Sequence, residues 1–233
     1  MKDQVREEPK IIAAAERQMQ AWSKAAESHV ALDDSVAIAA RLKPYVAISR
    51  EAGAGGSPVG QLVGNMLGWE VLDRDIIDRV SQRYKLPRPM LEMVDETQAN
   101  WAYDILGTWL DPKLVPHEKY VIHLGHVILA SACQASAVYV GRGVQFFLPR
   151  DRGLAVRIIA SESYRARRIA DRENISLKDA KRKMCNVDTG RRAFVRRFFH
   201  QDIEDPHLYD LVINVEHCGP KATAECIVAA LDR

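Results

Sequence analysis

Apolar positions along the chain follow two spacings, one typical of buried strands and the other of amphipathic helices. Between residues 10 and 31 they recur every three or four positions with charged residues between them, which predicts a helix ahead of the main domain. From Tyr45 onward, short apolar runs alternate with helical patterns. We expect strands over 45–49, 69–72, 137–141, 154–160 and 209–214, and helical segments over 57–67, 74–84, 87–133, 162–173, 176–200 and 220–232.

Strands that are separated by helices predict an α/β fold, in which helices cover both faces of a parallel sheet. The most plausible boundary lies near Pro44, so we divide the chain into an N-terminal helical extension, residues 1–43, and an α/β domain, residues 44–233. The apolar stripe of the extension predicts packing against the domain or against a second copy of the chain, which would form a homodimer through this helix.

Charge and composition exclude some partners. The chain has 33 Lys and Arg against 31 Asp and Glu, a net charge of +2, so the overall balance does not indicate nucleic acid or an acidic membrane surface as a partner. The first residues contain no uninterrupted apolar segment of the length found in a signal peptide, and no later stretch approaches the roughly 18 apolar residues of a membrane span. We therefore expect a cytoplasmic protein without a nucleic-acid or membrane partner.

The stretch "YVAISREAGAGGSPVGQLV", residues 45–63, predicts a buried strand, a glycine-rich turn and a helix, the order in which phosphate-binding loops are built. On the pattern G-x-x-x-x-G-K-[ST], Gly55 is the second glycine and Ser57 the hydroxyl that holds magnesium, but Gly56 replaces the lysine. Arg50 stands at the first glycine. Backbone N–H groups at the helix start can still bind an anion, although a simple tight turn explains the motif equally well. The predicted phosphate-binding residues are Gly53, Ala54, Gly55, Gly56, Ser57 and Pro58.

Several segments together resemble the cytidylate kinase-like family of P-loop proteins. They are "ISREAGAGGSPVGQLVGNMLGWEVLDRDII", "GRGVQFFLP", "VRIIASESYRARRIADRENIS", "VDTGRRAFVRRFF" and "DPHLYDLVINVE". The resemblance implies a three-layer fold of the P-loop NTPase type, with a five-stranded parallel sheet in the order 2-3-1-4-5 and a helical lid. It also implies ATP with Mg²⁺ as phosphoryl donor and a nucleoside monophosphate such as CMP as acceptor.

Two positions at predicted strand ends are candidates for binding the acceptor. Asp73 matches the acidic residue that the family carries after its second strand, although an aspartate there is also a favoured helix N-cap. Arg142 lies in "GRG" after the next strand, where a guanidinium can pair with an acceptor phosphate. Gly143 stands where related cytidylate kinases show an aspartate.

The region 162–200 is dense in arginine, and the resemblance implies that it forms the lid. Arginines from a lid can stabilise the charge of a transferring phosphoryl group and so replace the missing lysine. We predict that Arg168, Arg191 and Arg192 act in this way, and that Arg50 completes the phosphate-binding loop from the strand side. The resemblance implies that Asp188 contacts the acceptor. The alternative for the arginines is a solvated basic helix face.

Two functions follow. One is a kinase that moves the γ-phosphoryl of ATP to a nucleoside monophosphate or a related small acceptor. The other is a non-catalytic module that binds or senses a nucleotide, which the lysine-less loop and the N-terminal extension favour.

Overall fold

The computed structural model describes residues 42–73, 124–125, 128–129, 131–141 and 143–231. The predicted helices over 10–31 and 74–84, most of the segment 87–133, and Arg142 lie outside these residues.

The chain divides into two compact units. One consists of Met1–Lys43 and Leu72–Ala135, and the other of Pro44–Val71 and Ser136–Arg233. The described residues of the first unit include helical positions between 124 and 134, and the N–H of Lys43 donates a hydrogen bond to the carbonyl of Ala132 at 2.8 Å. The division of the chain into an extension, 1–43, and a domain, 44–233, stays a prediction.

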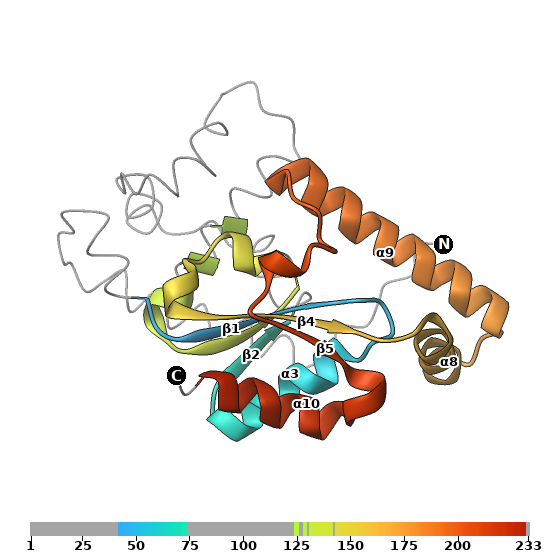
Figure 1. Cartoon of the computed structure of the whole chain (residues 1–233), viewed down its shortest axis with the longest axis horizontal. Helices are drawn as coiled ribbons and strands as arrows, with labels where there is room; N and C mark the ends of the chain where they lie inside the picture. Colours follow the sequence, from blue (N-terminus) through green and yellow to red (C-terminus); the bar gives the residue numbers. More distant parts are fainter. Residues whose placement is uncertain (1–41, 74–123, 126–127, 130, 142, 232–233) are drawn as a thin grey trace, which may run out of the picture. The chain divides into compact units, whose positions relative to one another are not determined.

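Five strands form one sheet within the part of the chain that the structure describes (Figure 1). Their order is β2-β3-β1-β4-β5, which confirms the order implied by the resemblance. The central strand β1 pairs in parallel with β3 and β4, and β4 pairs in parallel with β5. The strands are β1 Tyr45–Arg50, β2 Glu70–Asp73, β3 Ala137–Val140, β4 Gly153–Ile159 and β5 Leu211–Asn214.

Helices α3 (Gly56–Leu67) and α10 (Val215–Leu231) cover one face of the sheet, as Figure 1 shows below the strands. Alternate residues of the strands point toward them, because side chains in a strand alternate between faces. Val46, Ile48, Val156 and Ile158 are therefore fully buried in one apolar core. Val59, Val63, Val215, Ala224 and Ile227 contribute the helical side of this core.

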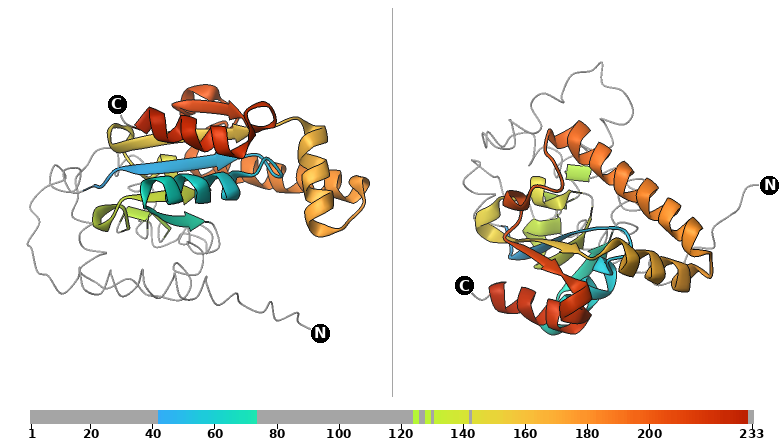
Figure 2. Two further views of the ribbon diagram at one scale, coloured as in Figure 1. Left: turned by 90° about the horizontal axis from the view of Figure 1, so that it is seen from below. Right: turned by 45° about the vertical axis from the view of Figure 1, so that its right-hand side comes forward.

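Helices α8 (Glu162–Glu173) and α9 (Leu177–Phe199) follow β4 and form a pair at the end of the sheet where the loop after β1 lies (Figure 2). Ser161 caps α8 by accepting a hydrogen bond from the N–H of Tyr164, and Ser176 caps α9 by accepting one from the N–H of Asp179. At its C-terminal end, α9 is held by Phe199, which packs on the rings of Phe146 and Phe147. The two predicted lid helices thus have the expected boundaries to within one residue.

The last helix differs from the prediction, which began it at residue 220. Helical structure begins at Val215, directly after β5, and is interrupted at Gly219, whose φ of 73° is left-handed. Asn214 helps to start this first turn, because its side-chain oxygen accepts a hydrogen bond from the N–H of Glu216. The predicted segment is the part after the kink, where Pro220 restarts the helix.

Candidate functional site

The turn between β1 and α3 depends on two glycines with left-handed backbones. Gly53 has a φ of 82° and Gly55 a φ of 87°, conformations that other residues adopt only at a cost. Gly53 is also restricted by space, since a Cβ atom there would lie 2.6 Å from the carbonyl oxygen of Arg165. The predicted glycine-rich turn is therefore a tight loop packed directly on the start of α8.

The N-terminus of α3 has the features of an anion site. Gly55 is its N-cap, with no side-chain hydrogen bond, and its first turn contains no acidic residue. The first N–H groups of a helix lack intrahelical partners and lie at the positive end of its dipole. Ser57 is exposed in this first turn, as is Pro58, whereas Ala54 is fully buried in the core and shapes the loop from below.

A cavity of about 480 Å³ opens over this helix start. It brings together seven of the predicted site residues, from the loop, the end of β1, and both lid helices. Its lining residues are Arg50, Glu51, Gly53, Gly55, Gly56, Ser57, Arg168, Asp171, Arg172 and Arg191. We call it the loop cavity.

Arg50 is the last residue of the central strand β1 and lines this cavity. A Cβ atom at Gly56 would lie 2.6 Å from the Cγ of Arg50, so the side chain of Arg50 passes directly over Gly56. Its guanidinium lies against Gly141, at the end of β3, where a Cβ atom would collide with it. The position that holds lysine in the general pattern is thus occupied by glycine because the stem of an arginine crosses it.

Two lid arginines reach the loop from above. Arg168 places its guanidinium 3.0 Å from the position of a Cβ atom at Gly55, and it is oriented by Tyr164, whose hydroxyl accepts a hydrogen bond at 3.0 Å. Arg191 donates to the carbonyl oxygen of Arg50 at 2.7 Å. Positive charge therefore surrounds the helix start from the strand side and from both lid helices.

An ion-pair network fastens the loop to the lid, and its central residue, Arg165, was not predicted as a site residue. Arg165 lies 2.6 Å from a carboxylate oxygen of Asp188 and 3.3 Å from one of Glu51, and it donates to the carbonyl of Ala52. The other oxygen of Asp188 accepts a hydrogen bond from the N–H of Ala52 at 2.8 Å. The signal in the sequence was position: Arg165 lies in the first turn after a strand that neighbours the loop.

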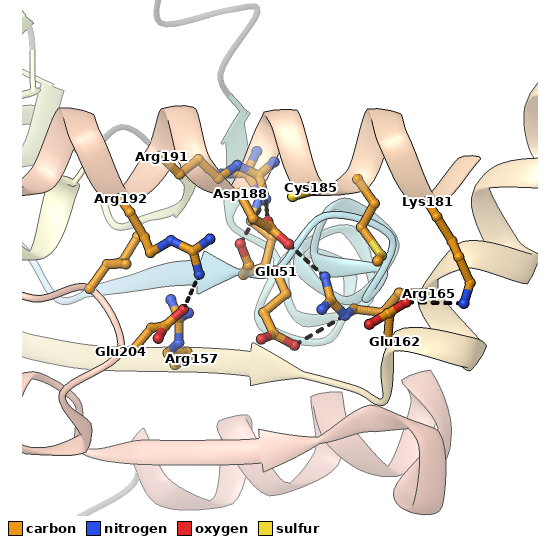
Figure 3. A pocket seen from close by; sticks show the side chains of 13 residues that line it. Glu51, Arg157, Glu162, Arg165, Lys181, Cys185, Asp188, Arg191, Arg192 and Glu204 are labelled. Atoms are coloured by element: carbon orange, nitrogen blue, oxygen red, sulfur yellow. Dashed lines mark hydrogen bonds and ion pairs between the residues drawn. The ribbon is translucent and has the colours of Figure 1, made fainter. Parts of the chain in front are cut away.

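A second cavity, of about 380 Å³, lies between β4 and α9, and we call it the strand cavity (Figure 3). Asp188 and Arg192 line it, as do Arg50 and Arg191, which also line the loop cavity. Arg192 does not reach the loop: it donates to Glu204 at 2.6 Å, and this hydrogen bond raises the pKa of the guanidinium. Arg192 thus shares the strand cavity with Arg191, but it does not line the loop cavity, where Arg168 and Arg191 meet.

Asp73 is the last residue of β2 and is partly buried, and it lines neither cavity. Arg142 lies outside the described residues, so its predicted role stays a prediction. Among the described residues, no group of three or more His, Cys, Asp and Glu side chains could hold a metal ion. No helix in the described part of the chain is long and apolar enough to cross a membrane.

Comparison with known proteins finds related sequences and a related fold. The model of the cytidylate kinase-like family matches residues 45–217. Cytidylate kinases from Thermococcus kodakarensis and Pyrococcus horikoshii are 31% and 28% identical to the chain over 104 residues, which cover 45% of this chain and 53% and 54% of theirs. The chain thus matches about half the length of these curated relatives.

One solved structure, an uncharacterized protein from Eubacterium ventriosum, shares the fold with a TM-score of 0.65. It is 21% identical and covers 82% of this chain and 98% of its own. The family match spans the sheet, the loop cavity and both lid helices, from β1 to the start of α10. The chain therefore belongs to the cytidylate kinase-like family.

Proposed function

We propose that the protein is a phosphotransferase that moves the γ-phosphoryl group of ATP to a nucleoside monophosphate or a related small acceptor. The observation that carries the proposal is the loop cavity, where an uncapped helix start faces four arginines from three different elements, β1, α8 and α9. The family to which the chain belongs, and the cytidylate kinases that it resembles, support phosphoryl transfer as the reaction class.

In this proposal the backbone of the loop binds the donor phosphates. The N–H groups at the start of α3 contact the phosphate oxygens, and the helix dipole adds a partial positive charge. Arg50, Arg168 and Arg191 stabilise the charge that spreads over the phosphoryl oxygens during transfer. They supply from outside the loop the charge that a lysine within the loop supplies in the general pattern.

The site also fits magnesium. Ser57 presents an exposed hydroxyl in the first turn of α3 at the edge of the loop cavity, and Mg²⁺ is commonly held by one such oxygen together with substrate phosphates and water. When bound, the ion would neutralise phosphate charge and orient the oxygens for transfer. Replacing Ser57 with Ala should therefore weaken binding of MgATP while leaving the stability of the protein unchanged.

For the acceptor, we propose a small nucleotide of the CMP type. Asp73 at the end of β2 and Arg142 after β3 would contact it, and Asp188 would position the lid over it. Gly143 has a left-handed backbone, with a φ of 66°, and provides no carboxylate at this turn. We therefore propose a base preference broader than that of an enzyme with an aspartate at this position, so that the acceptor is not restricted to a cytosine nucleotide.

A non-catalytic nucleotide sensor is the second candidate, and the observation that favours it is the glycine in place of the loop lysine. The test is to incubate the protein with ATP, Mg²⁺ and a panel of nucleoside monophosphates, and to measure ADP formation alongside calorimetric binding of ATP. Formation of ADP that requires one particular acceptor supports the kinase. Tight ATP binding without ADP for any acceptor would reject the kinase and support the sensor.

A further inference from the structure

Arg157 is the one charged residue among the buried polar residues of the described part of the chain, with 6% of its surface exposed. It lies in the middle of β4, between Val156 and Ile158, which face the core under α3 and α10. Because side chains alternate along a strand, Arg157 points to the opposite face, toward the strand cavity that it lines.

The partners of Arg157 are neutral. Its guanidinium donates to the hydroxyl of Ser49 at 3.1 Å and lies 5.6 Å from the ring centroid of Tyr209. Ser49 also accepts a hydrogen bond from the Tyr209 hydroxyl, so these three side chains form one buried group. No carboxylate among the described residues forms an ion pair with Arg157. Burying a charge without a counter-charge is costly, so a guanidinium kept in this position indicates a negatively charged ligand.

The strand cavity has an excess of positive charge around Arg157. Six cationic and four carboxylate side chains line it, and each carboxylate already has a cationic partner. Asp188 and Glu51 pair with Arg165, Glu162 with Lys181, and Glu204 with Arg192. Figure 3 shows these pairs around the cavity, with Arg157 on the strand side and Arg191 and Arg192 on the helix side.

We propose that the strand cavity is a second anion site, separate from the loop cavity, and that it binds a phosphomonoester group between Arg157 on β4 and Arg192 on α9. Guanidinium groups from opposite walls suit an anion with several oxygens, since each offers paired donors. The volume of about 380 Å³ is within the range of small-ligand sites.

Arg192 is available to such a ligand because its ion pair with Glu204 is weak. The side chains of Arg192 and Glu204 are 45% and 52% exposed, and exposed ion pairs contribute little to stability. Glu204 thus competes with the ligand for Arg192. Arg50 and Arg191 line both cavities, which places the second anion beside the phosphate cradle.

The experiment measures binding of inorganic phosphate, CMP and cytidine by calorimetry, in the absence of ATP, to the wild-type chain and three variants. Arg157→Met removes the buried charge and keeps most of the volume. Glu204→Gln releases Arg192. Arg182→Gln is the matched control, since Arg182 is an exposed α9 arginine that pairs with Asp179 and lines neither cavity.

We expect phosphate affinity to fall by about tenfold or more in Arg157→Met and to rise several-fold in Glu204→Gln, with no change in the control. A folding defect cannot produce the higher phosphate affinity of Glu204→Gln. Phosphate bound in the loop cavity would respond to neither substitution, because Arg157 and Glu204 do not line that cavity. We also expect Arg157→Met to melt no lower than the wild type without ligand. Phosphate affinity that is unchanged in both variants would overturn the proposal.

The arms with CMP and cytidine separate the sources of the anion. CMP that binds more tightly than phosphate, and through Arg157, assigns the site to the acceptor, whereas equal affinities assign it to free phosphate. Cytidine binding that depends on Arg157 would overturn the anion site. The proposal does not rest on the kinase activity: Arg157-dependent phosphate binding in a protein that forms no ADP would reject the proposed function alone.

Discussion

The loop after β1 and the helix pair α8–α9 make different contributions to the loop cavity, one of backbone shape and the other of side-chain charge. The loop from Ala52 to Ser57 has no charged side chain, and its glycines bring backbone N–H groups into the open. The helix pair contributes arginine side chains at long reach. Shape and charge therefore come from separate elements, whereas a loop with its own lysine would carry both.

This separation makes the junction between the two regions critical. Arg165 and Asp188 form the junction, since both belong to the lid helices and both hydrogen-bond the backbone of Ala52. Charge from the helices can act on the loop only if this junction holds the two in register.

The largest effect is expected from removing lid charge. Arg191→Ala should lower turnover by about two to three decades, because one group that stabilises transition-state charge contributes about 3 to 4 kcal/mol. Arg50→Ala should behave alike. Steady-state rates with the best acceptor of the panel measure this, with Arg182→Ala as control. Normal turnover in folded Arg191→Ala would leave that arginine a structural role only.

Disturbing the backbone conformation of the loop should have the next largest effect. Gly53→Ala forces a left-handed alanine against the carbonyl of Arg165, and we expect a loss of about 3 kcal/mol in unfolding free energy. Denaturant unfolding measures it. The control is Gly190→Ala on α9, where a Cβ atom would meet nothing within 4 Å. That change should stabilise by about 0.5 to 1 kcal/mol, so the same substitution has opposite signs in the two regions.

Weakening the junction should cost less. Asp188→Asn keeps an oxygen for the N–H of Ala52 but loses the ion pair with Arg165, whose side chain is only 12% exposed. We expect a loss of about 1 to 3 kcal/mol, measured by the same unfolding experiment. Glu162→Gln, which removes a pair with 62% and 56% exposed partners, should change almost nothing. Equal effects in both variants would mean that Asp188 is no more than a surface pair.

The smallest effect concerns pH and the contact between the lid helices. Hydrogen bonds from Lys183 and Arg172 lower the pKa of Glu173 below its usual 4.5. A lowered folded-state pKa stabilises the protein above the unfolded pKa, and this contribution is lost as pH falls through the folded value. The melting temperatures of Glu173→Gln and wild type should thus differ slightly at neutral pH and converge as the pH falls below 4.5 and through the lowered folded-state pKa. A gap that widens on acidification would contradict this assignment.

The positions of the strands and lid helices could be predicted because they depend on local patterns. A buried strand such as Tyr45–Arg50 needs a run of apolar residues, and a helix start such as Ser161 or Ser176 needs a capping side chain. The loop glycines could be predicted for the same reason. Prediction from local patterns placed the start of α10 too late, at residue 220. Pro220 marks the point where the helix resumes after the kink at Gly219, and not the point where the helix begins.

The amino-acid pattern alone specifies this order of elements and the residue types at the loop. Which charges meet depends on the folded chain, because arginines on one helix have similar neighbours in sequence, and their roles depend on how α8 and α9 pack on the sheet. Arg168 and Arg191 reach the loop cavity, Arg192 turns to Glu204, and Arg165 joins loop to lid. Arg157 gave a local signal, a charge within an apolar strand, but its neutral surroundings come from strand pairing and from Tyr209, more than fifty residues away along the chain.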